Sequence, residues 1–404
     1  MDTGTGRASW HLRANTFVIT YLLAALIAGV TQENIADGEP SWLTIHLLLL
    51  GATTNAIITW SDHFVSALLW TRSHDRRRQM VVVASLNVGI IGVLIAVSAH
   101  IGWLIIASAI VISGIIIFYL RGIMIAIKQS LNKRFAEVVY YYQSAGLLIL
   151  VGIVLGVIGA FISHEDPWEP RIVLAHLHVN LLGWVGLTII GTLVTLWPTV
   201  LRTQIHPRAV SFAVMGLRFL IAGVIGSIFA TLIDRPVFLA ISIAFYLVGA
   251  IIALAPAAAL MRTKQPDRAS SWMLLIGALG FALVLIGDFI IVLTHHSPEE
   301  TLSAIENQLL LIFTLWLLPT LLGSLTHLLP VVLGRGPAAN RELAAIMNRG
   351  WRWRLFLLPL SSFFLLLPAQ FHILGLILTA LSLGVFLILA AGALYRARAF
   401  SSTF

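Results

Sequence analysis

The chain has 404 residues, of which 59% are hydrophobic and only 10% are charged. Soluble domains carry about 25% charged residues, so this composition excludes an ordinary soluble protein and indicates one that crosses a lipid membrane many times. The chain has no cysteine, which excludes a disulfide, a thiolate metal site and a covalently attached c-type haem. Any metal must be held by histidine, carboxylate, methionine or backbone atoms.

Apolar segments follow one another along the whole chain. Because about 20 apolar residues cross a bilayer, we interpret the segments as about twelve transmembrane helices. They cover residues 14–31, 41–70, 79–98, 101–121, 138–162, 171–201, 209–232, 236–260, 271–294, 303–333, 353–369 and 371–395. The first has no small-residue cleavage site behind it, so we expect a retained span rather than a signal peptide. No polar linker separates the segments, and residues 1–404 are predicted to form a single all-α transmembrane domain.

The charged residues predict the orientation. An excess of 25 Lys and Arg over 17 Asp and Glu could indicate nucleic-acid binding, but nearly all the basic residues fall on alternate loops, as the positive-inside rule requires. Only Arg171, Arg218 and Arg235 fall elsewhere. The other loops are short and acidic. They hold Glu33, Asp37, Glu39, Glu165, Asp166, Glu169, Glu299 and Glu300. We therefore expect cytoplasmic N- and C-termini, a lipid environment and no nucleic-acid partner.

Three histidines lie at a similar depth in the outer half of two spans: His46 in the second span, and His176 and His178 in the sixth. An imidazole inside a membrane is costly and marks a candidate site. Residues two apart on a helix point about 200° from each other, so His176 and His178 can serve two centres on opposite sides of one helix. Histidine is the usual neutral ligand of haem iron, and we predict that these three residues bind haem.

Copper is the second metal that this set could hold. Copper(II) takes several imidazoles, and the predicted outer loop that follows the ninth span adds His295 and His296. The alternative for each ring is a neutral imidazole that hydrogen-bonds a neighbouring backbone carbonyl.

A second, inner layer of polar residues is predicted near the cytoplasmic side. Asp62 in the second span and Arg218 in the seventh are expected to form a buried ion pair, with a proton path as the alternative. His63 and His327, at matched depth, are candidates for a second metal site or a proton relay. Asp288, near the outer end of the ninth span, is a candidate proton acceptor.

The second and sixth spans share a short pattern. His46 is followed five residues later by Gly51, and His178 is followed five residues later by Gly183. The second, sixth and tenth spans are four helices apart, which suggests three four-helix units.

Three strings carry a resemblance to a known family. They are HLLLLGATTNAIITWSDHF (46–64), HLHVNLLGWVGLTIIGTLVTLWP (176–198) and LPTLLGSLTHLLPVVLG (318–334). The chain resembles integral membrane proteins related to haem-copper oxidase subunit I, especially twelve-span bacterial copper-oxidase-like proteins. It is also similar to the NnrS-like haem and copper membrane proteins linked to nitric oxide metabolism.

The resemblance implies three four-helix arcs in a bacterial-type plasma membrane, haem b, copper as a further metal, and an external electron donor or a multicopper-oxidase-like partner. It implies that His46 and one of His176 or His178 are haem ligands, and that the remaining histidine addresses a second centre. Unlike the respiratory oxidases, the chain has no histidine in the seventh span, no tyrosine at helical spacing after His178, and a single histidine, His327, in the tenth span. We therefore expect electron transfer, or nitric-oxide- or oxygen-related chemistry on the outer side, and not a typical proton-pumping oxidase.

Two other classes of function compete with a redox protein. A secondary transporter or metal-ion permease would use Asp62, Arg218, Asp288 and the histidines as relays, and would be expected to show inverted repeats and broken helices. A structural partner for another membrane or secreted subunit is the third class. A haem spectrum separates the first class from the other two.

Overall fold

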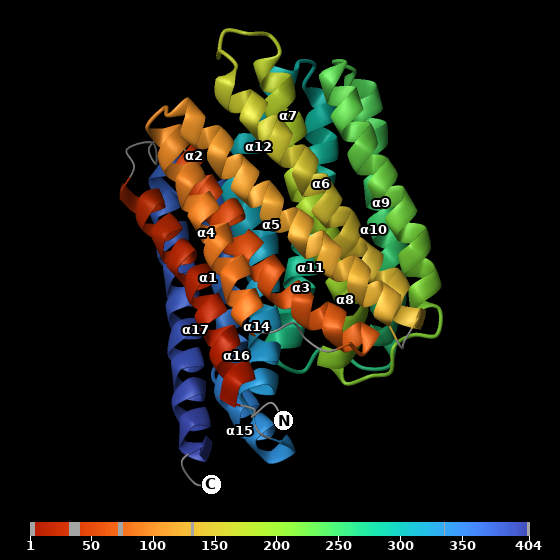
Figure 1. Cartoon of the computed structure of the whole chain (residues 1–404), viewed down its shortest axis with the longest axis vertical. Coiled ribbons are helices and arrows are strands. Elements are labelled where there is room, and N and C mark those ends of the chain that lie inside the picture. The colour runs from red at the N-terminus through yellow and green to blue at the C-terminus, as the bar shows by residue number, and fades with distance from the viewer. Residues whose placement is uncertain (1–4, 32–40, 72–75, 131–132, 335, 402–404) are drawn as a thin grey trace.

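The computed structural model describes residues 5–31, 41–71, 76–130, 133–334 and 336–401, and every regular element in these ranges is a helix. The helices stand side by side as one bundle (Figure 1). The first and last helices begin and end, respectively, at the same end of the bundle, here called the lower end (Figure 1). The predicted acidic loop with Glu33, Asp37 and Glu39 lies outside the described residues.

The helices are α1 (Thr5–Thr31), α2 (Trp42–His46), η2 (Leu47–Thr53), α3 (Thr54–Leu69), α4 (Arg76–Ser98), α5 (Gly102–Gln129), η3 (Lys133–Phe135), α6 (Ala136–Phe161), α7 (Glu169–His178), η4 (Val179–Gly186), α8 (Leu187–Leu201), α9 (Ala209–Leu232), α10 (Pro236–Ala259), η5 (Leu260–Arg262), α11 (Ala269–Thr294), α12 (Pro298–Glu306), α13 (Leu309–Leu311), η6 (Ile312–Leu317), α14 (Leu318–Leu333), α15 (Pro337–Met347), α16 (Trp351–Leu366), η7 (Ala369–Phe371) and α17 (His372–Ser401).

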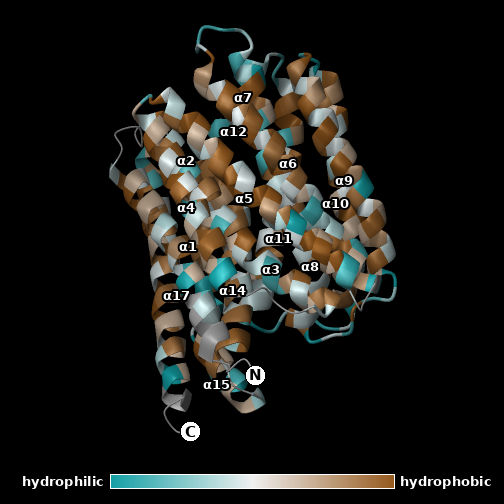
Figure 2. Cartoon of the chain, viewed as in Figure 1, coloured by the Kyte–Doolittle hydropathy of each residue, from teal (hydrophilic) through white to brown (hydrophobic). Residues whose placement is uncertain are grey.

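Within the described residues, eleven helical stretches are long and apolar enough to cross a membrane. They are Arg13–Thr31, Trp42–Leu69, Arg77–Ser98, Gly102–Gln129, Ala136–Phe161, Glu169–Leu201, Ala209–Leu232, Pro236–Arg262, Ala269–Thr294, Leu309–Leu333 and Ala369–Arg398. Each overlaps one of the predicted spans. Large apolar side chains such as Ile110 and Ile251 are exposed on the outside of the bundle, whose ribbon is largely brown (Figure 2). These features are those of a multi-pass membrane protein.

The predicted span 353–369 corresponds to α16, which has only 16 residues. At 1.5 Å per residue this helix is about 24 Å long, which is less than the roughly 30 Å apolar layer of a bilayer. The structure therefore supports eleven of the predicted spans by length and composition.

The second, sixth and tenth spans are the inner helices of the bundle. They bury 61%, 83% and 72% of their apolar windows, compared with 33–44% for the other eight spans. Each of the three contains a π-helix: η2, η4 and η6, respectively. The π-helix is rare and occurs frequently at functional sites. His46 directly precedes η2 and His178 directly precedes η4, so the predicted His–Gly pattern marks the first two of these segments.

Close packing of α11 on the tenth span gives a test of the fold. A Cβ on Gly280 would lie 2.1 Å from the backbone oxygen of Leu315, whereas a Cβ on Gly114 of α5 meets nothing within 4 Å. Gly280→Ala is therefore expected to destabilise the bundle by about 1–3 kcal/mol through overpacking. Gly114→Ala should leave stability equal or slightly higher, because alanine favours a helix. Thermal unfolding of both variants in one detergent checks this, and equal melting temperatures would contradict the packing.

Candidate functional site

His46 and His176 lie next to each other in the upper half of the bundle. His46 is the last residue of α2, and His176 lies in α7, three residues before η4 begins at Val179. Their ring centroids are 6.3 Å apart and their planes differ by 24°. Both residues are half-buried. The structure therefore brings together one predicted ligand from the second span and one from the sixth.

Each of these rings has one nitrogen held by a backbone carbonyl. His46 Nδ1 lies 2.8 Å from the oxygen of Trp42, and His176 Nδ1 lies 2.8 Å from the oxygen of Gly152. A carbonyl only accepts, so the hydrogen of each neutral ring is on Nδ1 when Nδ1 donates to that carbonyl, which leaves the lone pair on Nε2. The Asn180 amide nitrogen also lies 3.3 Å from His176 Nδ1, but that amide makes its shorter bond, 2.7 Å, to the His176 carbonyl, so we assign Nδ1 to the Gly152 carbonyl. No described residue hydrogen-bonds either Nε2 atom. Metal-binding histidines are usually oriented in this way, with the other ring nitrogen donating to a carbonyl or carboxylate.

Small and aromatic neighbours fix the two rings. Trp42 stacks on His46 with ring centroids 4.1 Å apart. A Cβ on Gly156 of α6 would lie 2.7 Å from His176 Cε1, and a Cβ on Gly152 would lie 2.5 Å from the side-chain oxygen of Asn180. The Asn180 amide in turn donates to the His176 carbonyl at 2.7 Å. The sequence analysis missed these supporting residues, although two glycines four apart are a known sign of close helix packing.

His178 faces the opposite side of α7. Its Nε2 lies 3.2 and 3.3 Å from the two carboxylate oxygens of Asp288 on α11. The exposed fractions are 1% for His178 and 9% for Asp288, so the pair is buried. His178 Nδ1 is buried and has no hydrogen-bond partner among the residues that the structure describes. Of the two histidines between which the sequence did not choose, the structure therefore places His176 beside His46 and His178 beside Asp288.

The other upper histidines lie apart from this pair. His295 Nδ1 is 3.0 Å from the oxygen of Ile291, and His372 Nε2 is 2.9 Å from the oxygen of Leu367. Across the part of the chain that the structure describes, no three His, Asp or Glu side chains are grouped so that they could hold a metal ion. A copper centre of several imidazoles therefore has no ligand set within those residues.

The inner layer differs from the sequence-based expectation. Asp62 accepts a hydrogen bond from Gln79 on α4 and lines a small cavity between α1, α3, α4 and α5. Arg218 is exposed on the outside of α9, so the structure does not bring Asp62 and Arg218 together as an ion pair. The physical reason is the rotation of each helix about its own axis. Two residues at equal depth in the membrane face each other only if both helices turn those side chains inward.

His63 and His327 are also in separate surroundings. The ring of His63 lies edge-on to that of His11, with centroids 5.4 Å apart, and edge-on to Trp60 at 5.8 Å. His327 lies on α14, where the charges of Arg202 and Arg268 act on it. The positive charges of Arg202 and Arg268 would oppose a metal cation at His327, which disfavours a metal site there.

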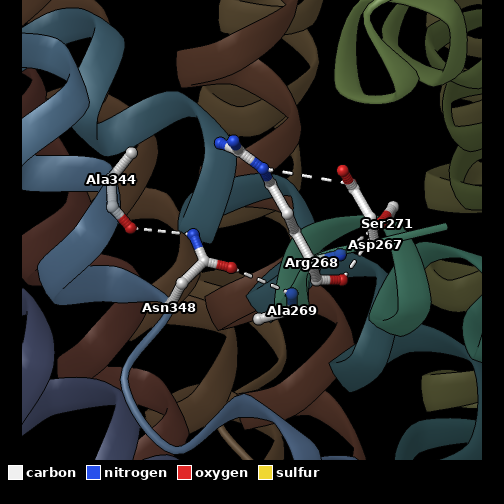
Figure 3. Close-up of polar contacts among 6 residues, drawn as sticks. All are labelled: Asp267, Arg268, Ala269, Ser271, Ala344 and Asn348. Carbon is white, nitrogen blue, oxygen red and sulfur yellow. Dashed lines mark hydrogen bonds and ion pairs between the residues drawn. The ribbon is translucent and has the colours of Figure 1, made fainter.

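Arg268 is held at the lower end of the bundle by a polar connection between α11 and α15. Arg268 is the N-cap of α11, and its carbonyl accepts from the Ser271 hydroxyl at 3.0 Å (Figure 3). The Asn348 side chain accepts from the backbone N–H of Ala269 at 2.9 Å and donates to the carbonyl of Ala344 at 2.8 Å (Figure 3). These bonds fix the start of α11 and connect it to the end of α15.

No protein-family model matches the chain, and no curated protein matches it significantly. The geometry of the His46–His176 pair is therefore the basis for a functional proposal.

Proposed function

We propose that this chain is a haem-binding redox protein of a bacterial-type plasma membrane, and that His46 and His176 are the axial ligands of one haem b. The observation that carries the proposal is the pairing of the two imidazoles, each with Nδ1 bonded to a carbonyl and Nε2 available. The chain thus resembles haem-copper oxidase subunit I in its use of histidines on inner spans.

The spacing of the two rings suits one metal ion between them. A metal–imidazole bond is about 2.0–2.1 Å long, so two rings on opposite sides of a metal would have centroids roughly 6.4 Å apart. The observed separation is 6.3 Å. Direct stacking brings rings closer, as Trp42 and His46 do at 4.1 Å.

The number of protein ligands favours haem over copper. A porphyrin supplies four nitrogens, so iron needs only two axial ligands from the protein. A copper(II) site needs several imidazoles, and the described residues offer no such group. The His46–His176 pair therefore fits haem, and copper is not needed to explain it.

The same pair favours electron transfer over chemistry on a bound gas. When bound, haem supplies a one-electron iron(III)/iron(II) couple. His46 and His176 would together hold the haem and would leave no ligand position for a gas, so we assign the chain to electron transfer and not to oxygen or nitric oxide turnover. The carbonyls of Trp42 and Gly152 orient the rings and raise their basicity, and Trp42 shields one ring face.

We also infer the arrangement in the membrane. The three inner spans with their π-helices support an architecture of three four-helix arcs, in which α16 is a short twelfth crossing. The distribution of basic residues supports a cytoplasmic lower end with both termini. His176 is then seven residues, or about 10 Å, below the outer start of α7 at Glu169. An external one-electron donor or a multicopper-oxidase-like partner could approach the centre from that side.

The test is a reduced-minus-oxidised absorption spectrum of the protein purified in detergent, together with its haem and metal content. We expect Soret and alpha bands of haem b and one haem per chain. A chain with neither bands nor iron would reject the proposal. Uptake of a substrate or metal ion by proteoliposomes that contain such a haem-free chain would instead favour the permease.

A further inference from the structure

The buried pair of His178 and Asp288 lies on the other side of α7 from the proposed haem ligands. The carboxylate of Asp288 belongs to α11, so this contact joins two different spans. A hydrogen bond to an ionised carboxylate is about twice as strong as one between neutral groups. With exposed fractions of 1% and 9%, the two side chains are shielded from competing solvent.

The rotation of α7 is not set by its own helix alone. Immediately after His178 the chain enters η4, a π-helix of eight residues. Adding or removing one residue in such a segment would rotate α7 by about 100° relative to α8. His176 would then no longer point at His46. The setting of α7 must therefore be fixed by contacts with its neighbours.

Within the described residues, three polar side-chain contacts join α7 to parts of the chain beyond the loop that precedes it. At its upper end Arg171 pairs with Asp234 at 2.9 Å, but these side chains are 25% and 36% exposed, and a surface ion pair contributes little. His176 itself contacts the carbonyl of Gly152. The third anchor is His178 on Asp288, which is both buried and directed to the side opposite His46.

We propose that Asp288 is a positioning residue for the haem ligands: by holding His178 on the α11 side of α7, it sets the rotation that points His176 toward His46. The inference rests on the proposed function, because it assigns a role to residues behind that same site. It also gives His178 a different task from the one expected of it, since its Nε2 is committed to Asp288 and not to iron.

The experiment compares Asp288→Leu with Asp288→Asn in the full chain. The asparagine oxygen can still accept from His178 Nε2, whereas leucine cannot. We expect Asp288→Leu to lower the haem bound per chain about tenfold or more, as loss of an outer-shell partner does for metal sites. Asp288→Asn should stay within about twofold of the wild type, with its low-spin iron(III) electron paramagnetic resonance signal unchanged. Arg171→Ala is the matched control, because it removes the more exposed anchor of the same helix, and it should also retain haem.

A double variant keeps the test valid if Asp288→Leu alone does not fold. In His178→Phe/Asp288→Leu both polar partners become apolar, a change that can be nearly neutral for stability. We expect this variant to elute from size-exclusion chromatography like the wild type and still to lack the low-spin haem signal. Wild-type haem content in Asp288→Leu, or equal defects in the Asn and Leu variants, would overturn the proposal.

A haem-independent readout separates this inference from the proposed function. Because the chain has no cysteine, spin labels can be placed on Val154→Cys of α6 and on Trp168→Cys, the N-cap position of α7, which are two exposed positions. We expect Asp288→Leu to shift or broaden the distance between the labels, and Asp288→Asn to preserve it. A wild type without haem would reject only the proposed function. An unchanged distance in Asp288→Leu would reject the positioning role.

Discussion

Replacing His176 with glycine should abolish the low-spin haem spectrum of the purified protein. The substitution removes one of two axial ligands, and even the loss of an outer-shell partner costs about 10–100-fold in metal affinity. Replacing His46 with glycine should have the same effect, because the two rings are on one site with centroids 6.3 Å apart. Absorption and electron paramagnetic resonance spectra at matched protein concentration measure the loss.

Added imidazole distinguishes a lost ligand from a damaged fold. We expect free imidazole to enter the space left in His176→Gly or His46→Gly and to restore the low-spin spectrum at least partly. His372→Ala serves as the control, since His372 is engaged with the carbonyl of Leu367 and should keep the wild-type spectrum. An unchanged spectrum in His176→Gly would remove that residue from the site, and restoration by imidazole in a His178→Gly variant would assign the ligand to His178 instead.

Gly156→Ala is expected to displace His176 and to lower haem occupancy about tenfold. A Cβ at this position would lie 2.7 Å from His176 Cε1, which is closer than real Cβ contacts allow, and 3.0 Å from its Nδ1, which is unusually tight. Overpacking of this kind costs about 1–3 kcal/mol, and part of it would be relieved by moving the imidazole. Haem content per chain and the position of the Soret band are the measurements.

Gly159 supplies the matched comparison on the same helix. A Cβ there would approach the side chains of Ile172 and Val173 no closer than 3.8 Å, which is ordinary contact. Gly159→Ala should therefore bind haem like the wild type. If both variants retain haem equally, the close contact between Gly156 of α6 and His176 has no role in ligand placement.

Hydropathy predicted most of the fold because lipid imposes long apolar helices. In the segment 353–369 the helix is shorter than a typical span, and the sequence around it shows why. Gly350, with φ of 61°, precedes α16, and Pro368 follows its end, so the apolar run is longer than the helix it forms. Hydropathy alone does not predict the residues at which such a helix begins and ends. Hydropathy also does not predict the π-helices, because their hydrogen-bond pattern depends on packing between spans.

For the candidate site, the sequence predicted how deep each histidine lies along its span. It did not predict which neighbouring helix each side chain faces. Histidine periodicity correctly separated His176 and His178 onto two sides of one helix, but the rotation of α7 decides which of them meets His46. The same limit explains the Asp62–Arg218 pair: both depths are inner, yet Arg218 is exposed on the outside of α9. The closely placed Gly152 and Gly156 were a readable signal for the helix that packs against the site.

The most direct test is a cryo-electron microscopy map of the protein isolated from membranes in the presence of haem. We predict planar density between His46 and His176, with the Nε2 atom of each ring about 2 Å from the central metal. A map in which the two imidazoles contact only protein, or in which iron is bound by His178, would contradict the assignment.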